Sequence, residues 1–175
     1  MIVVFTGNGK GKTTSCLGHM MRAAGQGKRT LMLQFIKGPW ISGEHKFIDT
    51  HSELKKNIEI VRGGKGFVGI LNDTLPFTTH KHAAEKLLDR AKKAITSKRY
   101  NLIVLDEVNV AVSLKLVKPS VVLKIVKQMP RDKIIILSGR YAPMSFIRAA
   151  DLATEMKEIK HPFHKGKKAQ VGFEF

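Results

Sequence analysis

Short apolar runs alternate along this chain with segments whose apolar residues recur every three or four positions. Apolar runs of this length predict buried strands, here over 2–6, 29–36, 57–61, 101–105, 133–137 and 151–156. The three-to-four periodicity predicts helices, over 13–24, 76–98, 119–129 and 143–150. A last strand is expected in the tail, over 171–175.

The strands IVVF, TLMLQF, LIVL and IIIL have no polar face apart from a glutamine near the end of the second. Strands that are apolar on both sides and alternate with helices are typical of a parallel sheet covered on both faces. The sequence therefore predicts an α/β fold with a mostly parallel sheet and helices on both faces. A chain of 175 residues is expected to form a single domain, spanning 1–175.

The first strand runs into a glycine-rich loop, TGNGKGKTT, and a helix follows it. In that setting glycines turn the backbone so that its N–H groups face an anion, and the helix start adds positive charge. The loop predicts a P-loop NTPase-like fold. The nucleotide-binding residues expected in it are Gly7, Asn8, Gly9, Lys10, Gly11, Lys12, Thr13 and Thr14. The usual pattern is G-x-x-x-x-G-K-[ST], and Thr6 stands here in place of its first glycine.

Acidic and basic residues follow three other strands. Asp106 and Glu107 end the run LIVL and are expected, with the Thr13 hydroxyl, to hold Mg²⁺. Lys37 and Arg140 follow two further strands, and ligands of open α/β sheets bind at such strand ends. Capping groups and surface cations remain the alternative interpretations of these four residues.

The chain carries 31 Lys and Arg against 14 Asp and Glu, a net charge of +17. This excess suggests a polyanionic partner, but the lysines are scattered and form no block typical of a nucleic-acid arm, so diffuse surface charge is favoured. Nucleic acid is neither expected nor excluded. The single cysteine, Cys16, excludes an internal disulfide framework, and no stretch is long and apolar enough to insert in a membrane. A cytoplasmic protein is expected.

Several further motifs occur in a fixed order after the loop: QFIKG, LDEVN, SGRYAP, ADLATEM, KHP and AQVGFEF. Together with TGNGKGKTT they resemble the P-loop type of ATP:corrinoid adenosyltransferase over essentially the whole chain. The resemblance implies transfer of the 5′-deoxyadenosyl group of ATP to the cobalt(I) of a reduced corrinoid, with release of triphosphate, in adenosylcobalamin biosynthesis or salvage. It further implies Mg²⁺ or Mn²⁺, a homodimer, ATP held reversed along the loop, and a cellular reductase or flavin protein that reduces cobalt.

The resemblance also implies roles for individual residues. Lys12 and Glu107 are the expected catalytic residues, with Thr13, Asp106 and Glu107 at the metal and Arg140 at the nucleotide. The expected corrinoid-binding residues are Phe67, Gly69 and Lys37. Gly69 departs from the family, which has tryptophan there, and the one tryptophan of this chain is Trp40.

Two other functions are compatible with the residues. The loop, Asp106-Glu107 and the +17 charge would also suit a nucleic-acid-stimulated P-loop ATPase of recombinase type. Gly69 would suit a nucleotide or corrinoid carrier without turnover. The histidines show no zinc-ligand spacing and are expected to be packing or surface residues, and Cys16 is expected to pack inside.

Overall fold

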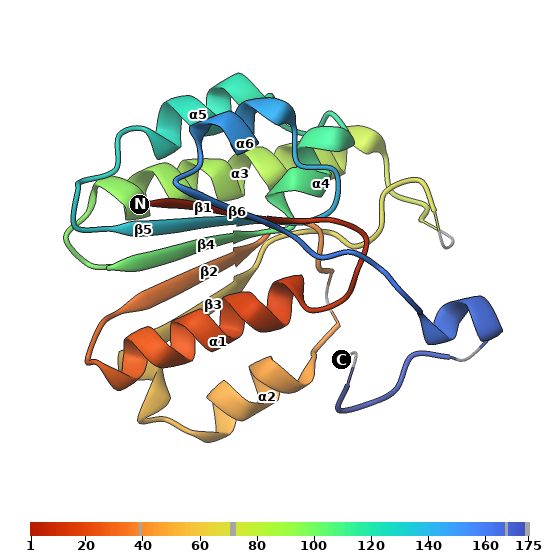
Figure 1. Cartoon of the computed structure of the whole chain (residues 1–175), viewed down its shortest axis with the longest axis horizontal. Helices are drawn as coiled ribbons and strands as arrows, with labels where there is room; N and C mark the ends of the chain where they lie inside the picture. The colour runs from red at the N-terminus through yellow and green to blue at the C-terminus, as the bar shows by residue number, and fades with distance from the viewer. Residues whose placement is uncertain (39, 71–72, 167, 174–175) are drawn as a thin grey trace.

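Six parallel strands form one sheet in the order β3-β2-β4-β5-β1-β6 (Figure 1). This computed structural model describes residues 1–38, 40–70, 73–166 and 168–173. The strands are β1 (Ile2–Thr6), β2 (Thr30–Gln34), β3 (Ile58–Arg62), β4 (Leu102–Asp106), β5 (Ile134–Ser138) and β6 (Leu152–Glu155). The α-helices are α1 (Lys12–Gly25), α2 (Gly43–Thr50), α3 (Phe77–Thr96), α4 (Val108–Ser113), α5 (Pro119–Val126) and α6 (Met144–Ala149). Two short 3₁₀ helices are η1 (Leu54–Lys56) and η2 (Pro162–Lys165).

Alternate residues of the strands build two separate cores. Ile2 and Val4 of β1 belong to the larger core under α3, α4, α5 and α6, whereas Val3 and Phe5 face α1. Figure 1 shows the two helical layers on opposite faces of the sheet, with α2 on the α1 side. This arrangement confirms the predicted α/β class with helices on both faces. None of the helices in the described ranges is long and apolar enough to span a membrane.

The sequence prediction missed two helices, α2 and α4. Three of the six residues of α4, VNVAVS, are valines, whose β-branched side chains favour a strand locally. Tertiary packing overrides that preference, because Val108 and Ala111 are fully buried in the larger core. The predicted final strand is wrong for residues 171–173, which form a turn, and residues 174–175 lie outside the described residues. Val171 is 80% exposed there, so its apolar character reflects no sheet pairing.

The end of α3 depends on one buried lysine. Lys133 is 4% exposed, and its Nζ donates hydrogen bonds to the carbonyl oxygens of Ile95 at 2.9 Å, Ala94 at 3.4 Å and Ser97. These carbonyls at the end of a helix have no partner within the helix. Burial lowers the pKa of Lys133. The ammonium thus ties α3 to the start of β5.

We predict that Lys133→Met lowers the free energy of unfolding by about 1–3 kcal/mol, because the Ile95 and Ser97 carbonyls lose this donor, whereas the Ala94 carbonyl keeps the Ser97 hydroxyl at 2.9 Å. Urea unfolding followed by circular dichroism measures the change. The matched control is Lys127→Met, which replaces an exposed lysine at the end of α5 and should leave stability within about 0.5 kcal/mol. Equal stability of the two variants would contradict the role of Lys133.

Candidate nucleotide and metal site

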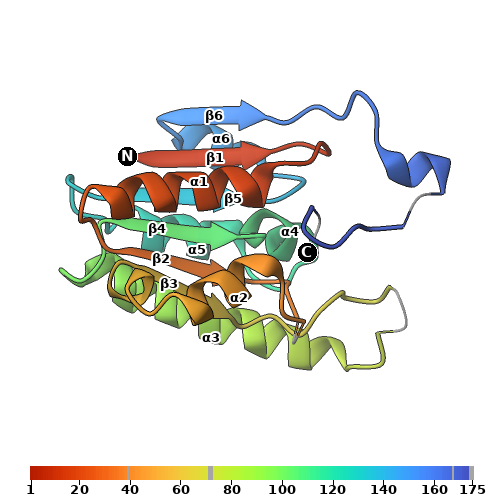
Figure 2. The same ribbon diagram turned by 90° about the horizontal axis from the view of Figure 1, so that it is seen from below.

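The glycine-rich loop joins β1 to α1 at the carboxyl end of the sheet (Figure 2). Gly7 and Gly11 have φ of 93° and 107°, which lie in the region that glycine adopts readily. A Cβ at Gly7 or Gly9 would collide with the carbonyl oxygen of Met156. The Gly9 N–H donates to that same oxygen at 2.7 Å. The glycines therefore let the loop lie directly against the chain that leaves β6.

Thr6 accounts for the departure from the usual loop pattern. Its Oγ1 accepts a hydrogen bond from the Ala142 N–H at 3.1 Å, and its carbonyl oxygen accepts from the Met156 N–H at 2.8 Å. A glycine at this position would lose the first of these bonds. The side chain of Thr6 thus connects the start of the loop to the segment that follows β5.

Lys12 lies under the loop. It is 7% exposed, and its Nζ donates to the carbonyl oxygens of Gly7 and Gly9, each at 2.7 Å. Burial lowers the pKa of Lys12 and Arg140 acts in the same direction, while the charge of Glu107 raises it. The ammonium is held where backbone N–H groups and the start of α1 also favour an anion.

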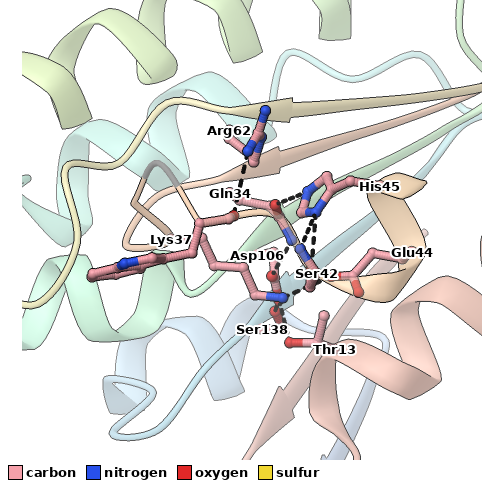
Figure 3. A network of polar contacts seen from close by, with 10 residues as sticks. Thr13, Gln34, Lys37, Ser42, Glu44, His45, Arg62, Asp106 and Ser138 are labelled. Atoms are coloured by element: carbon pink, nitrogen blue, oxygen red, sulfur yellow. Dashed lines mark hydrogen bonds and ion pairs between the residues drawn. The ribbon is translucent and has the colours of Figure 1, made fainter. Parts of the chain in front are cut away.

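The Asp106 carboxyl is fully buried and accepts hydrogen bonds from three elements (Figure 3). Its Oδ1 accepts from Ser138 Oγ at 2.7 Å and from Thr13 Oγ1 at 3.1 Å. Its Oδ2 accepts from Gln34 Nε2 at 3.3 Å. Because the Thr13 proton is directed at Asp106, the lone pairs of the Thr13 oxygen remain available to a cation.

Glu107 is the second carboxyl of the site. Burial raises the pKa of Glu107 to about 7, and the neighbouring Asp106 charge adds to the rise against the opposing effect of Lys12. Its backbone has a φ of 60°, and its N–H donates to Ser138 Oγ at 3.3 Å. A Cβ at Gly139 would stand 3.0 Å from Glu107 Oε2, so the neighbouring glycine makes room for this carboxyl.

The donor set fits Mg²⁺ or Mn²⁺. Two adjacent carboxyls and a hydroxyl are hard oxygen ligands. Burial and the neighbouring Asp106 charge raise the pKa of Glu107, and a divalent cation bound there would favour its ionised form. In the part of the chain that the structure describes, no three His, Cys, Asp or Glu residues group as a complete metal site. Magnesium commonly takes only one or two protein carboxylates and completes its shell with phosphates and water.

A pocket of about 500 Å³ opens above the loop. It brings together most of the residues predicted from the sequence: Asn8, Gly9, Lys10, Gly11, Lys12, Thr13, Thr14, Lys37, Glu107 and Arg140. Gly7 instead lines a neighbouring pocket of about 440 Å³ beside β6, and Asp106 lies beneath Thr13. Lys37 Nζ forms an ion pair with Glu44 Oε1 at 2.7 Å.

The tail contributes to the pocket as well. Figure 2 shows the chain passing beyond the carboxyl end of β6 and turning back toward the loop. Phe173 and Gly172 line the pocket, and Lys10 Nζ lies 4.9 Å from the centre of the Phe173 ring.

The predicted corrinoid residues lie apart from this pocket, except for Lys37. The ring of Phe67 packs on Trp40 with 5.7 Å between centroids, and the two side chains are 44% and 60% exposed. A Cβ at Gly38 or Gly66 would crowd the Trp40 ring, at 2.9 and 3.0 Å from its nearest atoms. Gly69 has a φ of 69° and its N–H donates to Asp73 Oδ2 at 2.9 Å.

Sequence reasoning missed the residues that support Asp106. Gln34 and Ser138 are fully buried and contact it directly, and His45 contacts Gln34. The role of Gln34 could have been predicted from the sequence, since a glutamine within an apolar strand needs a buried hydrogen-bond partner. Ser42 and His45 form a capping box at α2, in which histidine replaces the usual Glu or Gln and so conceals the motif.

Comparisons with known proteins agree with these findings. The family described as "ATP:corrinoid adenosyltransferase BtuR/CobO/CobP" matches residues 1–175. Proteins named corrinoid adenosyltransferase from Escherichia coli K12 and from a Sinorhizobium species are 31% and 36% identical, over 100% of this chain and 85% and 80% of their own lengths. A KaiC-like protein from Pyrococcus horikoshii superposes with a TM-score of 0.50 at 17% identity, covering 91% of this chain and 74% of its own, which shows the P-loop NTPase-like fold alone.

We predict that Glu107→Gln stabilises the ligand-free protein increasingly between pH 4.5 and 7. The unfolded glutamate loses its proton near its ordinary pKa of 4.5, whereas the folded one keeps it to about 7. The native state therefore binds more protons in this range, and wild-type stability falls as pH rises. From below pH 4.5 to above pH 7, the stability difference should shift in favour of the variant by about 3 kcal/mol.

Urea unfolding in EDTA at pH 5 and pH 8 measures this difference. The exposed Glu85→Gln is the control and should show the same stability difference from wild type at both values. A Glu107→Gln effect that does not grow with pH would refute the burial argument.

Proposed function

Because the chain belongs to the ATP:corrinoid adenosyltransferase family, we propose that it transfers the 5′-deoxyadenosyl group of ATP to the cobalt(I) of a reduced corrinoid and releases triphosphate. The enzyme is a transferase whose substrates are ATP and a corrinoid, and it acts in the formation of adenosylated cobalamin. The family and the relatives do not favour a recombinase-type ATPase or a carrier without turnover.

The observation that carries the proposal is the set of cations around the loop. Lys12, Arg140 and Lys37 belong to three different elements or connections, yet all line one pocket. Glu44, the ion-pair partner of Lys37, lines it as well, so Lys12 and Arg140 supply most of its positive charge. In this reaction the bond between the 5′ carbon and the triphosphate breaks, and the leaving triphosphate gains negative charge. Fixed cations aimed at that charge stabilise the transition state more than the ground state.

Cobalt(I) of the substrate is the nucleophile, so the protein has to supply none. Cys16 is fully buried, and burial strongly raises the pKa of its thiol. It is therefore an inert packing residue. The task left to the protein is to hold the 5′ carbon in line with cobalt and to exclude competing water.

We assign Mg²⁺ or Mn²⁺ to Thr13 and Glu107, with Asp106 holding the Thr13 hydroxyl in place. The ion, when bound, neutralises charge on the triphosphate. Asn8 lines both pockets, and we propose that it contacts the nucleotide where it leaves the loop. By resemblance to the family, ATP lies reversed along the loop, so that the whole triphosphate is gripped as a leaving group.

For the corrinoid we propose the aromatic pair Trp40–Phe67. A flat macrocycle is suited to an exposed aromatic surface, and both rings are about half exposed. Trp40 thereby supplies the second aromatic ring that Gly69 cannot. Lys37 connects the two regions, since it lines the phosphate pocket and its neighbour Gly38 lies against the Trp40 ring.

The remaining proposals rest on resemblance to the family. We propose a homodimer in the cytoplasm that receives reduced corrinoid from a cellular reductase or flavin protein. The diffuse placement of the +17 charge gives no support to a nucleic-acid partner.

We predict that ATP, Mg²⁺ and chemically reduced cobalamin yield adenosylcobalamin and triphosphate, and that Lys12→Ala lowers kcat/KM at least about 100-fold. Product analysis by chromatography measures both. The exposed Lys28→Ala should retain wild-type rates. Orthophosphate release that rises with added DNA would overturn the assignment, and near-normal turnover of Lys12→Ala would overturn the role of that lysine.

We predict that Trp40→Ala raises KM for the corrinoid about tenfold, in line with a stacking loss of roughly 1–3 kcal/mol per ring. KM for ATP should stay unchanged. Steady-state kinetics with each substrate varied in turn separate the two constants. Trp40→Phe should restore part of the affinity, and Phe47→Ala, which removes an exposed aromatic of α2, should have no effect on corrinoid KM. A change confined to ATP would contradict the proposed surface.

A further inference from the structure

A chain of buried polar side chains runs from the start of α2 to Asp106 (Figure 3). The Ser42 N–H donates to His45 Nδ1 at 3.1 Å, and His45 Nε2 lies 2.9 Å from Gln34 Oε1. Gln34 Nε2 in turn donates to Asp106 Oδ2 at 3.3 Å. All four residues are buried, so each hydrogen bond replaces one that water would otherwise make.

Ser42 makes two contacts with His45 Nδ1, through its backbone N–H at 3.1 Å and its Oγ at 2.8 Å. A backbone N–H can only donate, so His45 Nδ1 accepts, and a neutral ring then carries its proton on Nε2. Gln34 Oε1 accepts that proton, which turns the amide NH₂ toward Asp106. An ionised carboxylate can only accept, so it fits this end of the chain.

The surroundings of His45 keep its ring neutral. Burial lowers the pKa of His45, and the charges of Arg62 and Lys37 act in the same direction, while Glu44 and Asp49 oppose them. A protonated ring would place an Nδ1–H against the Ser42 N–H and would leave Ser42 Oγ as its acceptor.

We propose that His45 is a positioning residue for the metal site, acting through Gln34 on Asp106. By fixing Gln34, it sets the orientation of the carboxylate whose Oδ1 accepts the Thr13 proton, and this keeps the Thr13 oxygen open to the cation. Without the His45 donor, the Gln34 amide can turn and present its oxygen to Asp106, which repels it. The proposal rests on the metal assigned to Thr13 and Glu107 in the proposed function.

A purely structural role for His45 makes a different prediction. His45 also completes the capping box of α2, and glutamate or glutamine is the usual partner of serine in that motif. His45→Glu therefore keeps the cap acceptor but has no proton for Gln34 when ionised. His45→Gln keeps the acceptor and supplies a donor. The added charge of glutamate would by itself strengthen cation binding, which is opposite to the effect expected from loss of the chain.

The test compares ATP binding by titration calorimetry in EDTA and in saturating Mg²⁺, for wild type and both variants. We expect His45→Glu to lose about tenfold or more of the Mg²⁺-dependent gain in ATP affinity, as for other residues that orient metal ligands. His45→Gln should keep the gain to within about threefold. Affinities in EDTA should match between the two variants, because both keep the cap. Circular dichroism should show both to be folded, and a lower unfolding midpoint of His45→Glu measures the cost of its buried charge.

Four outcomes overturn the proposal. If His45→Glu keeps the wild-type Mg²⁺ gain, or loses affinity equally in EDTA, His45 only holds α2 and the metal assignment stands. If the ATP affinity of the wild type does not depend on Mg²⁺, the metal assignment in the proposed function is wrong, and this inference, which rests on it, is wrong as well. Imidazole ¹⁵N NMR of the ligand-free protein gives an independent check, since a ring protonated on Nδ1 instead of Nε2 would refute the chain itself.

Discussion

The buried carboxylate of Asp106 is the interaction on which the site depends. It ends β4 and accepts hydrogen bonds from β2, β5 and the first turn of α1, through Gln34, Ser138 and Thr13. A buried charge of this kind is tolerated only when it is well hydrogen-bonded or paired with a cation. Its three neutral donors meet the first condition, and they fix three neighbouring strand ends and the phosphate loop relative to one another.

The parallel sheet makes this convergence possible. β1, β2, β4 and β5 all end at the same edge, so residues far apart in the sequence meet there without long connections. The phosphate loop is further tied to the chain that follows β6, through Gly9 and Met156, and to the segment after β5, through Thr6 and Ala142. The loop is thus supported on both sides before any ligand binds, which reduces the conformational entropy that binding would cost.

Much of this architecture could be predicted from local pattern. The strands and long helices follow from apolar periodicity, and the phosphate pocket from one glycine-rich loop and the residues after three strands. The supporting residues could not be predicted, because their roles arise from contacts between segments distant in sequence. His45 shows this well: its capping role is local, while its contact with Gln34 depends on how α2 lies over the end of β2. The strand predicted for the tail was wrong because a local apolar pattern does not show what it contacts. Val171 and Phe173 do not enter a sheet, and Phe173 lines the nucleotide pocket instead.

The charges of the ligand-free pocket explain why metal and triphosphate should bind together. Burial and Asp106 raise the pKa of Glu107, while burial and Arg140 lower the pKa of Lys12, so in the ligand-free pocket the ionised form of each group is disfavoured. A metal cation lowers the cost of ionising Glu107, and a polyphosphate lowers the cost of keeping Lys12 charged. Each ligand bound alone would leave one of these costs in place and add its own unpaired charge to a partly desolvated site. Their joint binding removes both costs, so the pocket favours the metal–triphosphate complex over either part, and triphosphate that departs with its metal is stabilised in the same way.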